Sequence, residues 1–150
     1  MFRFSLETLL RLRLAERDQR RAELAKALRA EELLHGEERA LAGQQAQAVD
    51  HARRLKSPGA ANMDALLETH RYEIVLAAQR RQLKQQIAQV EAETERRRQA
   101  LVEADRQLRV LEMLRDRQAA AWKKATERQE VKEFDELAIV GYSRRQEAPA

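Results

Sequence analysis

A single internal break in an otherwise helix-forming sequence constrains this chain more than any other feature. Ser57-Pro58-Gly59 interrupts a sequence that is rich in Ala, Leu, Arg, Gln and Glu, all strong helix formers. Proline has no backbone N–H and disfavours helix in the residue before it, so a helix cannot pass through this point. The sequence therefore predicts one long helix on each side of the break.

After the break, two rows of residues interleave at alternating spacings of three and four. One row is Leu83, Val90, Arg97, Ala104 and Leu111, and the other is Ile87, Thr94, Leu101 and Leu108. A period of 3.5 residues is typical of a left-handed coiled coil.

Before the break the apolar repeat is less regular. Its register slips by one residue between Leu28 and Leu34, and arginines stand where leucines are expected. Gly36 and Gly43 each weaken a helix by about 1 kcal/mol relative to alanine. One alternative is a helix that splits at His35-Gly36. We expect instead a continuous but locally weak helix, because the seven-residue repeat crosses both glycines.

These patterns predict an all-α fold: an antiparallel two-helix coiled-coil hairpin with a longer second helix. A short loop makes neighbouring helices antiparallel. At 1.5 Å per residue, the second arm extends about 30 to 40 Å beyond the first. The predicted elements of the single domain 1–150 are helix one at about 5–56, a loop at about 57–62, helix two at about 63–140 and a flexible tail at 141–150.

The residues that begin each helix follow from capping preferences. Ser5 is a candidate N-cap for helix one, with Phe4 and Leu9 placed to pack together across it. Asn62 or Asp64 is expected to cap helix two.

Composition argues against several other classes of protein. Aromatic residues make up 4% and charged residues 36%, and the 29 basic and 25 acidic residues are interleaved. Such a mixed surface is typical of a solvated helix exterior. The chain has no cysteine, no apolar run long enough to span a membrane and no signal-peptide pattern at its start. A cytoplasmic, non-membrane-spanning protein is therefore expected.

No enzyme motif is found. Four scattered glycines cannot form a phosphate-binding loop. We interpret His35, His51 and His70 as lacking the spacing and carboxylate neighbours of a helical zinc site, and the adjacent Asp135 and Glu136 as surface residues. No catalytic residue, metal or cofactor is expected.

Arginine-rich runs such as "RLRLAERDQRR" leave a nucleic-acid-associated coiled coil as an alternative. Carboxylates intervene in nearly every run and aromatic stacking platforms are absent, so we expect no nucleic-acid partner. A self-assembling structural rod is a further alternative.

The end of helix two carries three of the six aromatic residues, Trp122, Phe134 and Tyr142, beside Leu137 and further aliphatic residues. Without an intramolecular partner this segment remains exposed, and amphipathic helices of this kind dock on other proteins. The alternative is that it folds back on the hairpin or self-associates.

Both ends of the chain resemble the family of flagellar export proteins called FliJ. The resemblance rests on the opening "FRFSLETLLRLR" and the closing "LEMLRDRQAAAWKKATERQEVKEFDELAI". The matching positions are Leu111, Glu112, Leu114, Arg117, Gln118, Lys132, Asp135 and Glu136.

The resemblance implies a non-enzymatic stalk and adaptor of the flagellar type III protein export apparatus. Such a protein binds the hexameric export ATPase and stimulates it, and contacts the cytoplasmic domain of the membrane-embedded export gate and the export chaperones. It is cytoplasmic and peripherally associated with the inner membrane. An injectisome stalk protein of the same architecture is the alternative.

The resemblance also implies two sets of binding residues. The ATPase-facing set is Phe4, Leu6, Leu9, Leu10, Arg13, Trp122, Lys132, Phe134, Asp135, Glu136 and Leu137. The gate-facing set is Tyr72, Leu76, Gln79 and Leu83, in which Gln79 departs from the family's apolar pattern.

Two packing registers remain open at the start of helix two. Leu76 and Leu83 also fit the hairpin's own apolar row, which would occupy them. The alternative row, which would leave the Tyr72 face accessible, is Met63, Leu67, His70, Ile74 and Ala77.

Overall fold

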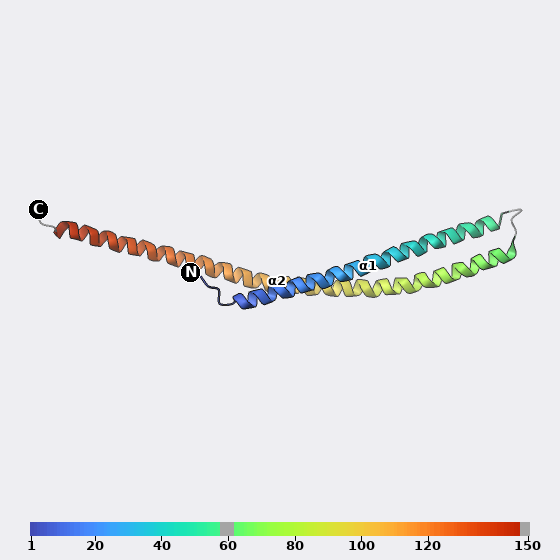
Figure 1. Cartoon of the computed structure of the whole chain (residues 1–150), viewed down its shortest axis with the longest axis horizontal. Coiled ribbons are helices and arrows are strands. Elements are labelled where there is room, and N and C mark those ends of the chain that lie inside the picture. The colour runs from blue at the N-terminus through green and yellow to red at the C-terminus, as the bar shows by residue number, and fades with distance from the viewer. Residues whose placement is uncertain (58–61, 148–150) are drawn as a thin grey trace. The chain divides into compact units, whose positions relative to one another are not determined.

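The computed structural model describes residues 1–57 and 62–147, and its regular secondary structure there is entirely α-helical (Figure 1). Helix α1 spans Glu7–Leu55 (49 residues) and helix α2 spans Met63–Glu147 (85 residues). The predicted all-α fold with a longer second helix is confirmed. The predicted break at Pro58-Gly59 lies outside the described residues. Helix α1 runs unbroken through Gly36 and Gly43, so a split at His35-Gly36 is wrong.

The start of α1 differs slightly from the expected cap. The backbone N–H of Leu10 donates to the carbonyl of Leu6 at 2.9 Å, which makes Leu6 rather than Ser5 the N-cap position. Phe4 is buried in a cluster with Leu10, whereas Leu9 is 37% exposed. Leu10 rather than Leu9 is thus the buried neighbour of Phe4 in this cluster, and the expected packing of Phe4 on Leu9 stays a prediction.

Asn62 caps α2, as one of the two sequence candidates. Its side-chain Oδ1 accepts from the backbone N–H of Ala65 at 3.2 Å, and its carbonyl accepts from that of Leu66 at 3.0 Å. At its other end α2 continues to Glu147, into the segment where the sequence suggests a tail.

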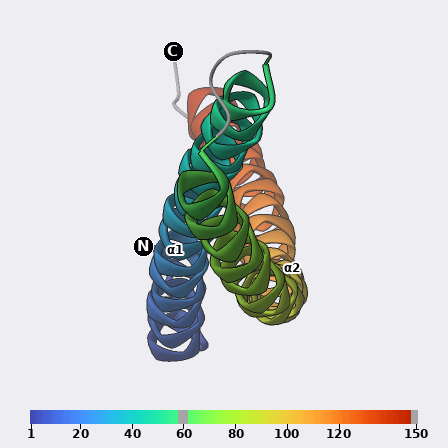
Figure 2. The same ribbon diagram turned by 90° about the vertical axis from the view of Figure 1, so that its right-hand side faces the viewer.

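The chain divides into two compact units, and both helices contribute to each. Unit 1 comprises Met1–Arg17 and Ala104–Ala150, and unit 2 comprises Asp18–Glu103. In unit 2 the helices run side by side in opposite directions, with the end of α1 beside the start of α2 (Figures 1 and 2).

The interface of unit 2 has the 3.5-residue period predicted for α2. Leu76 is 2% exposed, Leu83 6%, Ile87 7% and Thr94 3%. The alternative row at the start of α2 is wrong, because its members Met63, Leu67 and Ile74 are at least half exposed. A coiled coil accepts side chains of one helix between those of the other only while this spacing is kept.

The same period continues along α1 without the slip that the sequence suggests. Leu28 is 42% exposed and lies off the interface, while Ala27 beside it is 6% exposed and lies on it. The register of α1 is hard to recognise from hydropathy, because several of its interface positions hold charged or amide side chains. The partly or fully buried α1 positions in unit 2 that follow the alternating spacing are Arg20, Leu24, Ala27, Glu31, Leu34, Glu38, Leu41, Gln45, Ala48, Ala52 and Leu55.

Two arginines of α2 make polar contacts across this interface. Arg80 donates to Glu38 through Nε at 3.2 Å and to Gln45 through Nη1 at 2.6 Å. Arg97 donates through Nη1 to the backbone carbonyl of Glu23 at 2.8 Å. Each contact pairs a partly buried guanidinium with an acceptor on α1. Because these acceptors are within reach at only one alignment of the two helices, we infer that the two arginines help to set that alignment.

Unit 1 has a small apolar cluster of its own. Phe4, Leu10 and Leu108 are buried together, and Phe2 and Leu111 pack against them. The rings of Phe2 and Trp122 lie 6.3 Å apart between centroids at 47°. Aromatic pairs at this distance contribute about 0.5–1.5 kcal/mol beyond their buried area. The first residues of the chain are thereby held against α2.

A truncation of the most buried leucine tests the interface. Leu76→Ala should lower the free energy of unfolding by about 2–5 kcal/mol, because it opens a cavity between the helices. Urea unfolding followed by circular dichroism measures this change. Leu33→Ala is the control, since Leu33 is 70% exposed, and it should change stability by less than about 0.5 kcal/mol. Equal effects of the two substitutions would contradict the assigned register.

Glu38 gives the fold a predictable dependence on acid. A hydrogen bond from Arg80 lowers the pKa of the Glu38 carboxyl below its ordinary value of 4.5, with the nearby charges of Arg80, Lys84 and His35 acting in the same direction. A carboxyl whose pKa is lower in the folded chain stabilises the fold above the unfolded pKa, and this contribution is lost as pH falls through the folded value.

We therefore expect Glu38→Gln to be less stable than the wild type at neutral pH, and the difference to disappear at strongly acidic pH. Thermal unfolding across this range measures it. Glu37→Gln is the matched control, because Glu37 is exposed on the next position of α1. A stability difference for Glu38→Gln that stays constant with pH would show that the pair with Arg80 is not the cause.

Candidate functional site

The residues expected to face an ATPase all belong to unit 1, but they differ sharply in exposure. Phe4 and Leu10 are 8% and 7% exposed and form the apolar cluster with Leu108. Trp122 is 42% exposed and packs its ring on Phe2, which the sequence analysis did not single out. Phe4 and Leu10 therefore stabilise the packing of unit 1 and are largely inaccessible to a partner protein.

Leu6, Leu9 and Arg13 form the partly exposed side of α1 in this unit. Leu6 and Leu9 are 36% and 37% exposed. Leu9 and Arg13 border a shallow pocket whose other side is α2. The Arg13 guanidinium is paired with Glu16 one turn further along, with Nη1 and Oε2 at 2.7 Å.

A group of exposed large apolar residues lies near the end of α2, in residues 127–140, which we call the distal segment. Every residue of the distal segment is exposed. Its large apolar side chains have exposed fractions between 47% and 71%: Val131, Phe134, Leu137, Ile139 and Val140. A helix this apolar and this uncovered has the properties of a docking element.

Helical spacing places Val131, Phe134 and Leu137 on one side of the distal segment, whereas Ile139 lies on the other side among charged residues. Phe134 and Leu137 are three residues apart and share a face, as Val131 and Phe134 do. Lys132, Asp135 and Glu136 belong to the predicted ATPase-facing set and are exposed, but their positions turn away from the Phe134–Leu137 face. A partner that covers the Phe134–Leu137 face would therefore leave these charges on the opposite side of the helix.

The residues expected to face the export gate lie on α2 in unit 2. Leu76 and Leu83 are buried against α1, whereas Tyr72 is 48% exposed and Gln79 is exposed. Sequence reasoning did not predict that other large apolar residues at the start of α2 are exposed. They are Met63, Leu67, Ile74 and Val75, with exposed fractions from 50% to 68%.

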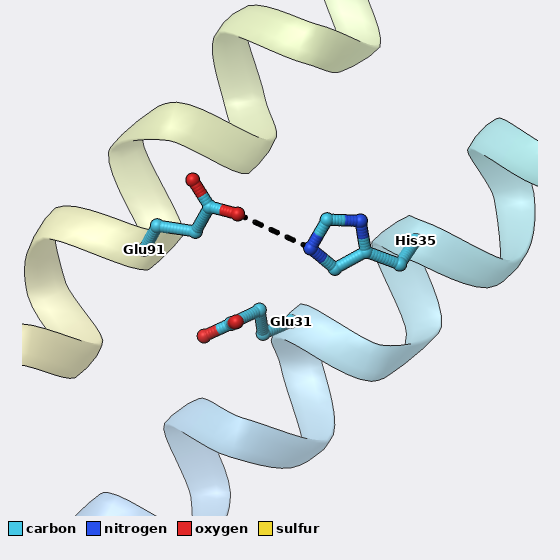
Figure 3. Close-up of side chains that lie close together, drawn as sticks. All are labelled: Glu31, His35 and Glu91. Atoms are coloured by element: carbon cyan, nitrogen blue, oxygen red, sulfur yellow. Dashed lines mark hydrogen bonds and ion pairs between the residues drawn. The ribbon is translucent and has the colours of Figure 1, made fainter.

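Two of the histidines have carboxylate neighbours that the sequence analysis overlooked. His35 Nε2 lies 3.2 Å from Glu91 Oε1 across the interface, and Glu31 lies one turn before His35 on α1 (Figure 3). His70 Nδ1 lies 3.7 Å from Glu73 Oε2 within α2. The signal for the pair Glu31 and His35 was their four-residue spacing.

In the part of the chain that the structure describes, neither helix is apolar enough over a sufficient length to span a membrane. The described surface thus combines an exposed, partly apolar helix end with a largely charged exterior.

Comparison with known proteins agrees with the resemblance noted in the sequence. The family model described as flagellar FliJ protein matches residues 2–147. No curated protein and no solved structure matches the chain. Because the family match covers nearly the whole sequence, the chain belongs to the flagellar FliJ family, whose members are non-catalytic components of the flagellar export apparatus.

Proposed function

We propose that this chain is a stalk and adaptor that binds the hexameric export ATPase of the flagellum through unit 1 and stimulates its assembly and turnover. The chain supplies no chemistry in this proposal, and hydrolysis belongs to the ATPase. Since the matching family is the flagellar one, this function is favoured over that of an injectisome stalk.

The proposal rests chiefly on the exposure of the distal segment. Phe134 is 71% exposed and Leu137 is 68% exposed, on one face of α2. Burial of one such side chain contributes about 1.5–3 kcal/mol. Two of them buried in a groove of the ATPase would supply a large part of the free energy of a micromolar complex, which is about 8 kcal/mol.

The remaining residues of the ATPase-facing set have supporting or peripheral roles in this proposal. Phe4 and Leu10 hold the start of the chain against α2. Lys132, Asp135 and Glu136 lie on the other side of the helix from Phe134 and Leu137, where charges affect the rate and specificity of association more than affinity.

A second contact, with the cytoplasmic domain of the export gate, is proposed at the start of α2. Tyr72 and Gln79 are the accessible members of the predicted gate-facing set, since Leu76 and Leu83 are occupied by α1. The chain would thereby link the ATPase to the gate at the cytoplasmic side of the inner membrane, and would also bind export chaperones.

Titration of the chain into its cognate export ATPase tests the first contact. The wild type should raise ATP turnover and shift the ATPase toward a larger oligomer. Phe134→Ala/Leu137→Ala should need at least a tenfold higher concentration for half of the effect, because about 3 kcal/mol or more of apolar burial is lost. Turnover assays and light scattering measure both quantities.

The matched control for this double variant is Leu33→Ala/Val102→Ala. Its residues are 70% and 55% exposed but lie in unit 2, so stimulation should be unchanged. If the wild type altered neither turnover nor oligomer size, the proposed function would be wrong. If the control lost as much as the distal variant, the assignment of the distal segment would be wrong.

The gate contact is tested with a single aromatic residue. Tyr72→Ala should weaken binding to the isolated cytoplasmic domain of the gate by about tenfold or more, as expected for an aromatic residue central to an interface. Val102→Ala is the control, because Val102 is 55% exposed, comparable with Tyr72 at 48%, and lies far along α2 from the proposed contact. Calorimetry compares the two affinities. Equal binding by the two variants would contradict a contact centred on Tyr72.

A further inference from the structure

Three side chains with metal-binding groups meet at the interface of unit 2. Glu31 and His35 occupy successive turns of α1, and Glu91 reaches toward His35 from α2 (Figure 3). One ligating atom from each lies within 4.8 Å of the other two. Because both helices contribute, an ion held here would join α1 to α2.

We propose that Glu31, His35 and Glu91 form a binding site for Zn²⁺ or a chemically similar divalent transition-metal ion. This site is separate from the docking surfaces proposed above and does not depend on them. It would act as a clamp between the two helices in unit 2.

The kind of ion follows from the donor set. One imidazole nitrogen and two carboxylate oxygens suit Zn²⁺ and its neighbours in the first transition series, whereas Ca²⁺ and Mg²⁺ prefer oxygen ligands alone. Two carboxylates also offset the charge of a divalent ion. Three protein ligands and one water complete a tetrahedral zinc site.

The geometry needs only a small adjustment. Zinc binds these ligands at about 2.0–2.2 Å, so tetrahedral ligand atoms lie about 3.4 Å apart. The present separations of up to 4.8 Å exceed this by a distance that glutamate side-chain rotation can cover. The side chains are free enough to rotate, since those of His35 and Glu91 are 42% and 50% exposed. His35 and Glu91 already lie 3.2 Å apart.

The spacing of Glu31 and His35 on α1 also favours a shared metal ion. Residues four apart on a helix are neighbours on its surface, so Glu31 and His35 can hold one ion without a change of backbone. Glu91 is the ligand that makes the site bridge two helices. Metal binding to the folded arrangement would stabilise the pairing of α1 with α2, because the unfolded chain does not hold the three groups together.

The test uses the full chain without an affinity tag, freed of metal with a chelator and titrated with ZnCl₂ by calorimetry. The wild type should bind one Zn²⁺ per chain, and its melting temperature should rise with zinc concentration. His35→Ala should weaken binding by at least about tenfold, comparable to the loss seen when a supporting group of a metal site is removed. Glu91→Gln should lose most of the zinc-dependent rise in melting temperature, because the link to α2 is lost.

His70→Ala is the matched control. His70 also has a carboxylate neighbour, Glu73, but both residues belong to α2, so this variant should bind zinc as the wild type does. Circular dichroism without metal verifies that each variant is folded.

Four results would each overturn the proposal. They are absence of zinc binding by the wild type, undiminished binding by His35→Ala, an equal loss in His70→Ala, and zinc-induced dimerisation in light scattering. The last would place the bound ion between two chains.

Discussion

The structure depends on the pairing of α1 with α2 along an interface that is only partly apolar. In unit 2, leucine and isoleucine side chains of α2 are buried, whereas the interface positions of α1 mix leucines with small and charged residues such as Ala27, Glu31 and Ala48. Apolar burial alone would specify such a register weakly. The hydrogen bonds from Arg80 to Glu38 and from Arg97 to the Glu23 carbonyl are available at one register and thereby strengthen its selection.

The unequal lengths of the helices give this pairing its functional consequence. Helix α1 has 49 residues and α2 has 85, so a large part of α2 cannot be covered by α1. A helix in a protein gains most of its stability from packing of its apolar face against a neighbour. The exposed Phe134 and Leu137 are thus available to another protein, and the ATPase is the partner that we propose for them.

Much of the fold could be predicted from the sequence, because a 3.5-residue period and a single proline break leave few alternatives. The two interleaved rows of α2, one beginning at Leu83 and the other at Ile87, were predicted correctly, since most of their members are apolar. The register of α1 was misread because Leu28 is apolar yet exposed, whereas Glu31 and Glu38 occupy interface positions. Hydropathy identifies a charged interface position only when its partner on the other helix is known.

The candidate sites were harder to predict for the same reason. The sequence could not decide whether Leu76 and Leu83 face a partner or α1, since both arrangements satisfy helical spacing. The structure buries them, and leaves Tyr72 exposed.

The approach of Glu91 to His35 depends on the register between the helices, so only the four-residue spacing of Glu31 and His35 could have been recognised from the sequence. Hydrogen exchange along α2 in the free chain tests most directly whether α1 covers α2 from Leu76 to Leu108 and leaves the distal segment exposed. This arrangement predicts slow amide exchange from Leu76 to Leu108 and fast exchange over residues 127–140, whereas uniform exchange along α2 would contradict it.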